Sequence, residues 1–433
     1  MDSTAKNLVM EIDFQKLRLD GIYRQDEDNH LMLRLKLPSG RINSEQAVTL
    51  CDIAQRFTDG KLHLTCRGNL ELHWLPLADL ETARELLREA GLTSRGACGG
   101  AVRGISCNIA GHDRFPALSA LARRLQQHFT GNPQFEGLPK KFKIGIEPDT
   151  ASGRHLIQDA GLVLRQDKGD GPSYDLWVGG GLGREPRQGF LLAIDLAEDQ
   201  ILALLERVIA VYRTHGEAGR RLKHLIIKQG ADWLRRETGQ PAVEVALAGQ
   251  HRQIDNEKRL DINVFAGEID ARQLRAVAEV ASRFAGGEMV ITAEQNIALP
   301  LAMQEDHRRI REQLQGVGLG GDTRQERVQF RVCPGNHECR MGLAATRDVA
   351  RQVIEALGEN GRSCTWAISG CPNSCSQPQL ADFGIVTRKV SRQENGSPLP
   401  VFEIWRRSGE GIGECLAKDL QLADLITAVR NLR

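Results

Sequence analysis

Two short cysteine pairs near the C-terminal end organise this chain: Cys333-Pro-Gly-Asn-His-Glu-Cys339 and Cys371-Pro-Asn-Ser-Cys375. Thiolates are soft ligands of the kind that iron–sulfur clusters use, and four of them complete one cubane. Proline, glycine and asparagine around the cysteines favour tight turns, which present backbone N–H groups to the sulfurs of a cluster. The two pairs therefore predict one iron–sulfur site with four cysteine ligands.

Zinc, disulfides and a structural accident are the alternative explanations of these cysteines. Structural zinc sites usually space each pair by about two to four residues, which the C-x5-C of the first pair exceeds. Disulfides are unexpected because the N-terminal residues show no basic region followed by an apolar run, as a secretory signal would. An accident would not place both pairs among turn-forming residues. The ten cysteines instead suggest a reducing, cytoplasmic setting, where some are ligands and the others buried thiols.

Length and charge narrow the class of protein. A chain of 433 residues buries a large core and divides into roughly two to four domains. Its 57 basic and 56 acidic side chains nearly cancel, which argues against a nucleic-acid-binding or membrane-surface protein, because those carry a large positive excess. No stretch reaches the about 18 uncharged apolar residues of a membrane span.

The second cysteine pair also carries a family resemblance. The segment Ser369-Gly370-Cys371-Pro372-Asn373-Ser374-Cys375, preceded by a C-x5-C, resembles the sirohaem sulfite and nitrite reductases. The resemblance implies that four thiolates hold a 4Fe–4S cluster, namely Cys333, Cys339, Cys371 and Cys375. It also implies that Cys375 bridges the cluster to the iron of a sirohaem.

An internal repeat divides the rest of the chain. The first copy predicts a strand over 33–37, a helix over 45–57, a strand over 61–74 and a helix over 80–90. The second copy lies 227 residues later, so that Leu33 matches Leu260 and Asn69 matches Asn296. Each copy is too small to bury both faces of its sheet, so we expect the copies to pack as one pseudo-symmetric domain. The resemblance implies ferredoxin-like half-domains.

The fold class that follows is α/β (α+β), with a pair of half-domains and two cofactor-binding α/β regions. We expect half-domains over 1–92 and 246–322, a sirohaem- and anion-binding region over 93–245, and a cluster- and sirohaem-binding region over 323–433. Between the copies, helices are expected over 118–129, 188–212 and 219–237, with strands over 143–146, 161–165 and 175–178. The last region should contain helices over 340–357 and 416–432 and strands over 381–387 and 401–406, with a loop over 391–400.

The run Gly179-Gly180-Gly181-Leu182-Gly183 is not a dinucleotide fingerprint, because Arg184 stands where the last glycine would be. It is either a flexible turn or a place where backbone approaches a flat cofactor closely, as glycine permits. The resemblance favours the second interpretation.

The resemblance implies four cations at the oxyanion: Arg34, Arg103, Lys141 and Lys143. Arginine keeps its charge and offers a fork to an oxyanion, whereas a buried lysine beside other cations releases its proton readily. Two residues apart on a strand, Lys141 and Lys143 share one face, with Phe142 turned to the other. Each cation taken alone would more commonly be a solvated surface charge.

The resemblance also suggests contacts to the carboxylates of sirohaem. Thr65 and Arg67 lie in a segment similar to the Thr-Thr-Arg-Gln strand of the family. Weaker candidates for the same role are Lys140, Gln295, Asn296 and Asn373, while Cys375 would hold the cofactor through its iron. The chain departs from the family pattern at four places, with His63 for Arg, Glu71 for Gln, Gly100 for Asp and Gly104 for Asn.

The two copies differ where the chemistry is expected. Asp261 and Glu294 in the second copy match Arg34 and Arg67 in the first. Two exchanges of cation for anion suggest that only the first copy kept an anion-binding face. On that interpretation, replacing Glu294 by arginine should do little.

Together these features predict a sirohaem and 4Fe–4S reductase of sulfite, with nitrite as the alternative substrate. Lys143 favours sulfite, since plant-type nitrite reductases often carry asparagine there. A corrin-pathway oxygenase similar to precorrin-3B synthase is an alternative enzyme, and a haem-free electron-transfer protein is an alternative that is not an enzyme. No flavin- or NADPH-binding segment is apparent, so the expected electron donor is a separate protein, a ferredoxin or a flavoprotein subunit.

Overall fold

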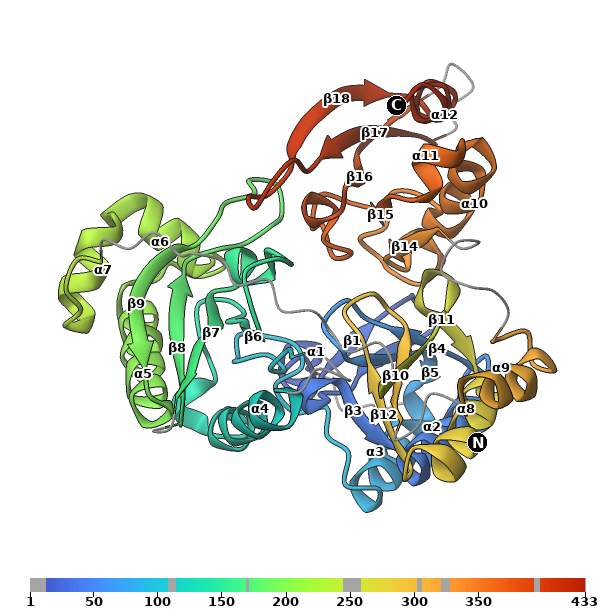
Figure 1. The fold of residues 1–433 in the computed structure, drawn as a ribbon, viewed down its shortest axis with the longest axis horizontal. Helices are drawn as coiled ribbons and strands as arrows, with labels where there is room; N and C mark the ends of the chain where they lie inside the picture. Colours follow the sequence, from blue (N-terminus) through green and yellow to red (C-terminus); the bar gives the residue numbers. More distant parts are fainter. Residues whose placement is uncertain are drawn as a thin grey trace, which may run out of the picture.

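The computed structural model describes residues 13–107, 114–168, 171–243, 258–301, 306–320, 328–392 and 398–432. Three parts built on β-sheets surround the middle of the molecule (Figure 1). The two repeat copies form one part, the region between them forms the second, and the C-terminal region forms the third. Within the described residues, no helix is long and apolar enough to cross a membrane.

The repeat copies contain matching elements. The first copy comprises α1 (Phe14–Leu17), β1 (Ile22–Arg24), β2 (His30–Arg34), η1 (Pro38–Gly40), β3 (Arg41–Asn43), α2 (Ser44–Phe57), β4 (Lys61–Leu64), β5 (Leu70–Pro76), η2 (Leu77–Asp79) and α3 (Leu80–Glu89). The second comprises β10 (Arg259–Ile262), η6 (Phe265–Gly267), β11 (Glu268–Asp270), α8 (Ala271–Phe284), β12 (Glu288–Ile291), β13 (Ile297–Pro300) and α9 (Asp306–Gln315). A shift of 227 residues takes both ends of α2 onto both ends of α8, as the sequence repeat predicts.

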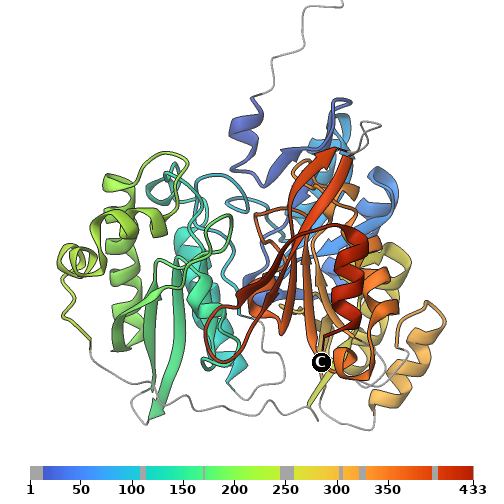
Figure 2. The same ribbon diagram turned by 90° about the horizontal axis from the view of Figure 1, so that it is seen from above.

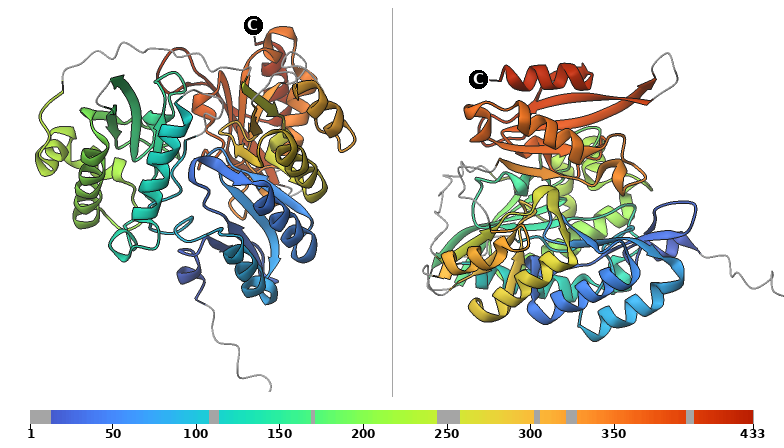
Figure 3. Two further views of the ribbon diagram at one scale, coloured as in Figure 1. Left: turned by 60° about the horizontal axis from the view of Figure 1, so that its bottom comes forward. Right: turned by 90° about the vertical axis from the view of Figure 1, so that its right-hand side faces the viewer.

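Each copy lends one strand to the sheet of the other. The first sheet has the order β1-β2-β5-β4-β11 and the second the order β10-β13-β12-β3, so β11 and β3 have changed places. Ile269 pairs with Leu62 in one exchange and Ile42 with Met289 in the other. The helices of both copies cover one face of this assembly (Figure 3), over a single apolar core. The exchange explains how two small ferredoxin-like halves bury their sheets together.

One predicted strand of the repeat is a hairpin. Residues 61–74 do not form a continuous strand, because the chain turns between β4 and β5. The Thr65 hydroxyl accepts hydrogen bonds from the backbone N–H groups of Arg67 (3.3 Å) and Asn69 (3.1 Å), and so closes the turn. A side chain that satisfies backbone donors locally competes with a strand ladder.

The second part carries a four-stranded sheet of order β6-β7-β8-β9. Its elements are α4 (Phe115–Phe129), η3 (Pro133–Phe135), β6 (Ile144–Glu147), η4 (Arg154–Ile157), β7 (Ala160–Lys168), β8 (Gly171–Val178), β9 (Phe190–Leu196), α5 (Glu198–His215), α6 (Leu222–Gln229) and α7 (Ala231–Thr238). The helix expected over 188–212 is wrong in its first third, where β9 pairs with β8. The helix expected over 219–237 is two helices, interrupted at Gly230.

The glycine run after β8 is held by the protein itself. A side chain on Gly180 would lie 2.0 Å from the Leu156 carbonyl oxygen, and one on Gly181 would lie 2.4 Å from an Arg221 nitrogen. Leu182 is buried with Ile157 and Leu380 in a small apolar cluster that joins the second part to the third. The run is therefore a tightly packed turn rather than a flexible one.

The third part is a five-stranded sheet of order β14-β15-β16-β17-β18, which faces the second part from across the molecule (Figure 2). Its elements are β14 (Gln329–Val332), η7 (Gly335–His337), α10 (Thr346–Ala356), α11 (Glu359–Arg362), β15 (Thr365–Ser369), η8 (Pro378–Leu380), β16 (Phe383–Arg392), β17 (Pro398–Arg406), β18 (Glu414–Leu420) and α12 (Leu422–Arg430).

Two expectations for the third part are wrong. The helix expected from residue 340 begins only at Thr346, because the preceding residues form a loop in which the Leu343 N–H donates to the Gly370 carbonyl at 2.7 Å. The helix expected over 416–432 is β18 followed by the shorter α12, because β18 pairs with β17. The loop expected over 391–400 is shorter, since β16 and β17 extend into it, and residues 393–397 lie outside the described chain.

Candidate active site

The topology of the third part brings the two cysteine pairs together. Strands β14 and β15 are parallel neighbours, with Val332 opposite Ile368. Cys333 follows β14 directly and Cys371 comes two residues after the end of β15. Because the carboxyl ends of parallel neighbours meet at one edge of a sheet, both pairs emerge side by side. The Gly370 N–H donates to Cys333 Sγ at 3.1 Å.

The two cysteine loops pack so closely that side chains are excluded at their contacts. A side chain on Gly342 would lie 2.2 Å from the Gly335 carbonyl carbon, and one on Gly370 would lie 2.9 Å from the Gly335 Cα. The Thr346 hydroxyl donates to the Cys333 carbonyl at 2.6 Å and fastens the first loop to α10. The positions of the thiols are therefore fixed by backbone packing.

The four thiols share one electrostatic environment. Burial and then Cys375 raise the pKa of Cys371 to about 11. Burial and then Cys375 likewise raise the pKa of Cys333, while burial is the main cause of the raised pKa of Cys339. No group of three or more His, Cys, Asp or Glu in the described residues could hold a single metal ion. Four cysteine thiolates are the usual ligands of a 4Fe–4S cluster, so a cluster fits this donor set.

The two candidate lysines lie on either side of a buried residue. Phe142 is fully buried and pairs with Val102 in an isolated bridge just before β6. Lys141 and Lys143 are half-buried and, two residues apart, point to the opposite face. Burial is the largest cause that lowers the pKa of Lys141, and the charge of Cys375 opposes it. Three cations add to the effect of burial, namely Arg103, Arg221 and Arg34, and the resulting pKa is about 8.

The same cations converge on Lys143 and Arg67. Burial, then Lys141, Arg67 and Arg221 lower the pKa of Lys143 well below its ordinary value. Burial, then Arg103 and Arg221 lower the pKa of Arg67 to about 10. The structure therefore brings all four predicted anion-binding cations together beside Cys375. Such mutual repulsion is relieved when an anion binds among the cations.

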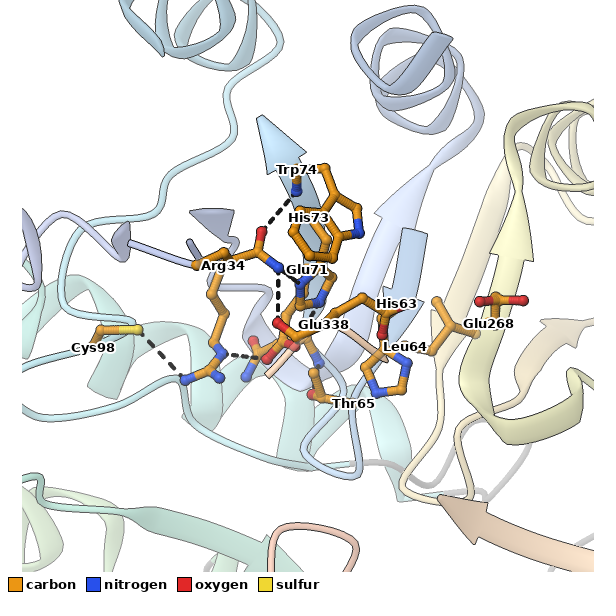
Figure 4. Close-up of polar contacts among 12 residues, drawn as sticks. Arg34, His63, Leu64, Thr65, Glu71, His73, Trp74, Cys98, Glu268 and Glu338 are labelled. Carbon is orange, nitrogen blue, oxygen red and sulfur yellow. Dashed lines mark hydrogen bonds and ion pairs between the residues drawn. The ribbon is translucent and has the colours of Figure 1, made fainter. Parts of the chain in front are cut away.

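Arg34 is held by a carboxylate on the neighbouring strand. Its Nε donates to Glu71 Oε1 at 2.6 Å, and its Nη1 donates to Cys98 Sγ at 3.5 Å (Figure 4). Burial alone would lower the pKa of Arg34, but Glu71, with smaller contributions from Cys98 and Tyr23, outweighs burial and raises it. The guanidinium therefore stays charged, and its remaining N–H groups are available to a ligand.

Arg103 closes its own loop. The guanidinium donates to the carbonyls of Ala97 and, at 2.9 Å, of Gly99, and its buried Nε has no partner in the described chain. Its backbone N–H donates to the Phe142 carbonyl at 2.8 Å, so this loop is attached to the strand that carries Lys141 and Lys143.

Arg221 is a site cation that the sequence interpretation missed. It is buried between the sheet and α6, and donates to Asp159 Oδ2 at 2.7 Å and to the Gly180 carbonyl at 3.2 Å. Asp159 is fully buried and also accepts from the backbone N–H of Lys143 at 2.8 Å. A lone arginine at the start of a helix carries no sequence signal for this role; only the pairing reveals it.

The remaining cofactor candidates differ in whether their side chains are already hydrogen-bonded within the protein. Arg67 donates to Gln158 Oε1 at 2.6 Å and to two backbone carbonyls. Gln295 uses its amide to join Leu64 and Val332, and Asn296 accepts from the Val264 N–H at 3.0 Å, so both stabilise the protein itself. Two candidates are exposed, namely Lys140 and Asn373.

The two exchanged positions of the second copy have different surroundings. Asp261 is a surface residue that pairs with Arg259, two residues away. Glu294 accepts from Arg154 and, at 2.8 Å, from Arg331, which in turn donates to the carbonyls of Ser376 and Gln377 just after Cys375. Glu294 is therefore part of the support of the Cys375 loop.

A polycarboxylate cofactor fits the charges around Cys375. Arg34 and Arg221 are paired with buried carboxylates, whereas four other cations have no carboxylate partner in the described chain: Arg67, Arg103, Lys141 and Lys143. Such an excess of buried positive charge needs anions to offset it. Sirohaem, with its many carboxylates, and a small oxyanion would together supply them.

His63 should make the fold acid-sensitive. It is 4% exposed on β4, and burial lowers its pKa to about 3 from an ordinary 6.5. The unfolded chain therefore binds a proton between pH about 6.5 and 3 that the folded chain does not, so stability falls as pH falls through this window. Compared with His63→Gln, the natural protein should lose about 2–3 kcal/mol more stability between pH about 6.5 and 4.5. Thermal unfolding of both proteins across this range is the measurement; parallel curves would contradict it.

Comparison with known proteins places these features in context. A family model described as the nitrite and sulphite reductase 4Fe-4S domain matches residues 99–245, and one described as the nitrite/sulfite reductase ferredoxin-like half domain matches residues 23–90 and 251–317. "Sulfite reductase [ferredoxin] 1" of Mycolicibacterium paratuberculosis is 24% identical over 90% of this chain and 75% of its own. "Ferredoxin--nitrite reductase" of Leptolyngbya laminosa is 27% identical over 96% and 89%. The solved structure of the Mycobacterium tuberculosis NirA protein superposes with a TM-score of 0.82 at 22% identity, covering 97% of this chain and 86% of that one.

Proposed function

Because this chain belongs to the nitrite and sulfite reductase family, we propose that it is a sirohaem-dependent reductase whose preferred substrate is sulfite. The protein is an oxidoreductase of the sulfite and nitrite reductase family, and it has an iron–sulfur cluster of the 4Fe–4S type. We assign the cluster to Cys333, Cys339, Cys371 and Cys375.

The observation that carries this proposal is the convergence of buried cations on Cys375. Lys141 and Lys143 both feel the charge of the Cys375 thiolate and the repulsion of neighbouring arginines. A site of this kind binds a small anion strongly and excludes neutral ligands, because the cations repel one another until an anion lies among them. Sirohaem bound there would supply an iron at which the anion is reduced by electrons from the cluster.

The side chains have distinct roles in this proposal. Arg34 and Arg103 keep their charge and orient the oxygens of the anion through guanidinium N–H groups. Lys141, with a pKa of about 8, both holds and releases a proton near neutral pH, which suits it to proton delivery at an anion oxygen. Lys143 neighbours it on the same face and shares that role.

A ferredoxin is the electron donor that we propose, acting in the cytoplasm. Relatives named as ferredoxin-dependent sulfite and nitrite reductases support this class of donor. The first cysteine loop also offers an approach, because Cys339 and its neighbour Met341 are exposed, the latter by 59%.

Lys143 should discriminate between the two substrates. Sulfite carries more oxygens than nitrite, so losing one cation that binds an oxygen should cost sulfite more. A charge-assisted hydrogen bond contributes roughly 1.5–3 kcal/mol, or about ten- to a hundredfold in kcat/KM if it acts fully in the transition state. We expect Lys143→Asn to lower sulfite turnover far more than nitrite turnover, measured by steady-state kinetics with a chemically reduced dye.

An equal fall for both anions would contradict the preference for sulfite and favour nitrite. The visible spectrum of the same preparations tests the cofactor, since a sirohaem shows a strong Soret band that a cluster alone lacks. A protein with a cluster spectrum and no Soret band would be an electron-transfer protein instead.

A further inference from the structure

Glu71 occupies a central place in the sheet of the first copy. On β5 it lies directly opposite Arg34 of β2 and also directly opposite His63 of β4. It is 5% exposed. Figure 4 shows its carboxylate between Arg34 and His73. A buried carboxylate in this position needs partners for both oxygens.

One oxygen of Glu71 has a hydrogen-bond partner, and the other lies close to a histidine. Oε1 accepts from Arg34 Nε at 2.6 Å, and Oε2 lies 3.3 Å from His73 Nε2 without a hydrogen bond between them. His73 Nδ1 lies 3.1 Å from the side-chain nitrogen of Gln25, which donates to the Glu338 carbonyl at 2.7 Å, in the loop of the first cysteine pair. Glu71 therefore binds Arg34 through Nε, and its other oxygen faces His73.

The charge of Glu71 is secure. Burial would raise its pKa, but Arg34 and then His73 outweigh burial and lower it. His63 faces Glu71 from β4, and burial lowers its pKa to about 3, so it stays neutral. The thiol of Cys339 also lies near, and its pKa is raised by burial and then by Cys375 and Glu71. Glu71 therefore places a fixed negative charge beside Arg34, the anion-binding cation to which it is hydrogen-bonded.

We propose that Glu71 is a specificity-determining residue that makes the anion site favour a monoanion, nitrite or hydrogen sulfite, over the sulfite dianion. It does so by offsetting the charge of Arg34 through Nε, while the terminal N–H groups of Arg34 other than the one directed at Cys98 remain to bind the anion. This inference rests on the proposed function and adds the charge class of the species that binds.

The test is Glu71→Gln in the holoenzyme. The amide oxygen of glutamine still accepts from Arg34 Nε, so the orientation of Arg34 is kept while the negative charge is removed. Coulomb energy scales with the charge of the ligand. If the loss of one negative charge from the protein raises the affinity for a monoanion about tenfold, it raises the affinity for a dianion about a hundredfold. Dissociation constants for nitrite and for sulfite, below and above the second ionisation of sulfurous acid, come from the change in the visible spectrum.

Asp175→Asn is the matched control. Like Glu71, Asp175 is a buried carboxylate that pairs with a partly exposed arginine; its partner is Arg165, at 3.1 Å. Unlike Glu71, it lies in the sheet of the second part. The Asp175→Asn substitution should therefore leave both dissociation constants unchanged. Glu71→Asp, which keeps the charge, should keep the preference for a monoanion.

Two results would overturn the proposal. In the first, Glu71→Gln raises the affinity for both anions by the same factor or lowers the affinity for both. Glu71 would then serve only to orient Arg34. The natural enzyme provides a second measurement in case the variant loses its cofactors. The ratio of its sulfite affinity to its nitrite affinity should fall as pH rises through the second ionisation, since the loss of charge on Lys141 weakens the binding of both anions. A ratio that rises would overturn the proposal. Natural enzyme that binds neither anion would instead refute the proposed function, and this inference with it.

Discussion

Replacing Cys375 by serine should abolish most of the anion-reducing activity and change the magnetic signal of the cluster. Cys375 is the thiol whose charge reaches the three other cysteines of its environment and both site lysines. Loss of an outer-shell partner of a metal site typically costs roughly 10- to 100-fold, and loss of the ligand that faces the anion site should cost more. The measurements are iron and acid-labile sulfide content, electron paramagnetic resonance and steady-state turnover.

Cys415→Ser is the control for this substitution. Cys415 is also partly exposed, but it lies on β18, where its thiol donates to the Ala417 carbonyl at 3.5 Å. Its replacement should leave iron, sulfide and turnover unchanged. A complete cluster and undiminished activity in Cys375→Ser would refute the assignment of this ligand.

Replacing Glu294 by arginine should be severely damaging, against the expectation from the repeat alone. The substitution would place a third guanidinium beside Arg154 and Arg331, the latter almost fully buried. Burial would raise the pKa of Glu294, but these two arginines outweigh burial and lower it to about 2. Removing one partner of a buried ion pair costs about 3–5 kcal/mol, and the partly exposed Glu294 should lie near the lower end. The Tm and the cofactor content of the purified protein are the measurements.

Asp261→Arg is the matched control, because Asp261 is the other position where the second copy carries an anion. Its side chain is 45% exposed, and surface ion pairs contribute only about 0–1 kcal/mol. Stability and cofactor content should therefore stay close to those of the natural protein. Equal losses in both variants would mean that the Glu294 network does not support the Cys375 loop.

Sequence patterns alone identified the parts of the molecule whose information is local or repeated. The cysteine spacing indicated a cluster, and the resemblance it carried led to the family. The repeat predicted matching elements because both copies keep one register, as α2 and α8 confirm. The alternation of Lys141, Phe142 and Lys143 predicted which side chain is buried, since a strand turns neighbours to opposite faces.

Local patterns failed where a segment suits two structures. The apolar residues of 188–212 and 416–432 fit a helix, but each begins as a strand because a neighbouring strand pairs with it. The hairpin after β4 was missed because a threonine hydroxyl, rather than a break in hydrophobic pattern, ends that strand. Such choices depend on contacts with other segments, which intrinsic preferences do not contain.

Only the tertiary structure decided how distant residues meet. Parallel pairing of β14 and β15 places the two cysteine loops at one edge, and the exchange of β3 and β11 joins the two halves. The pairs Arg34–Glu71 and Arg221–Asp159 depend on register between segments that have no common motif. The sequence determined which chemical groups the site contains, because residue type is local information. The fold determined which of them are paired, because partners for buried charges come from whichever strands become neighbours.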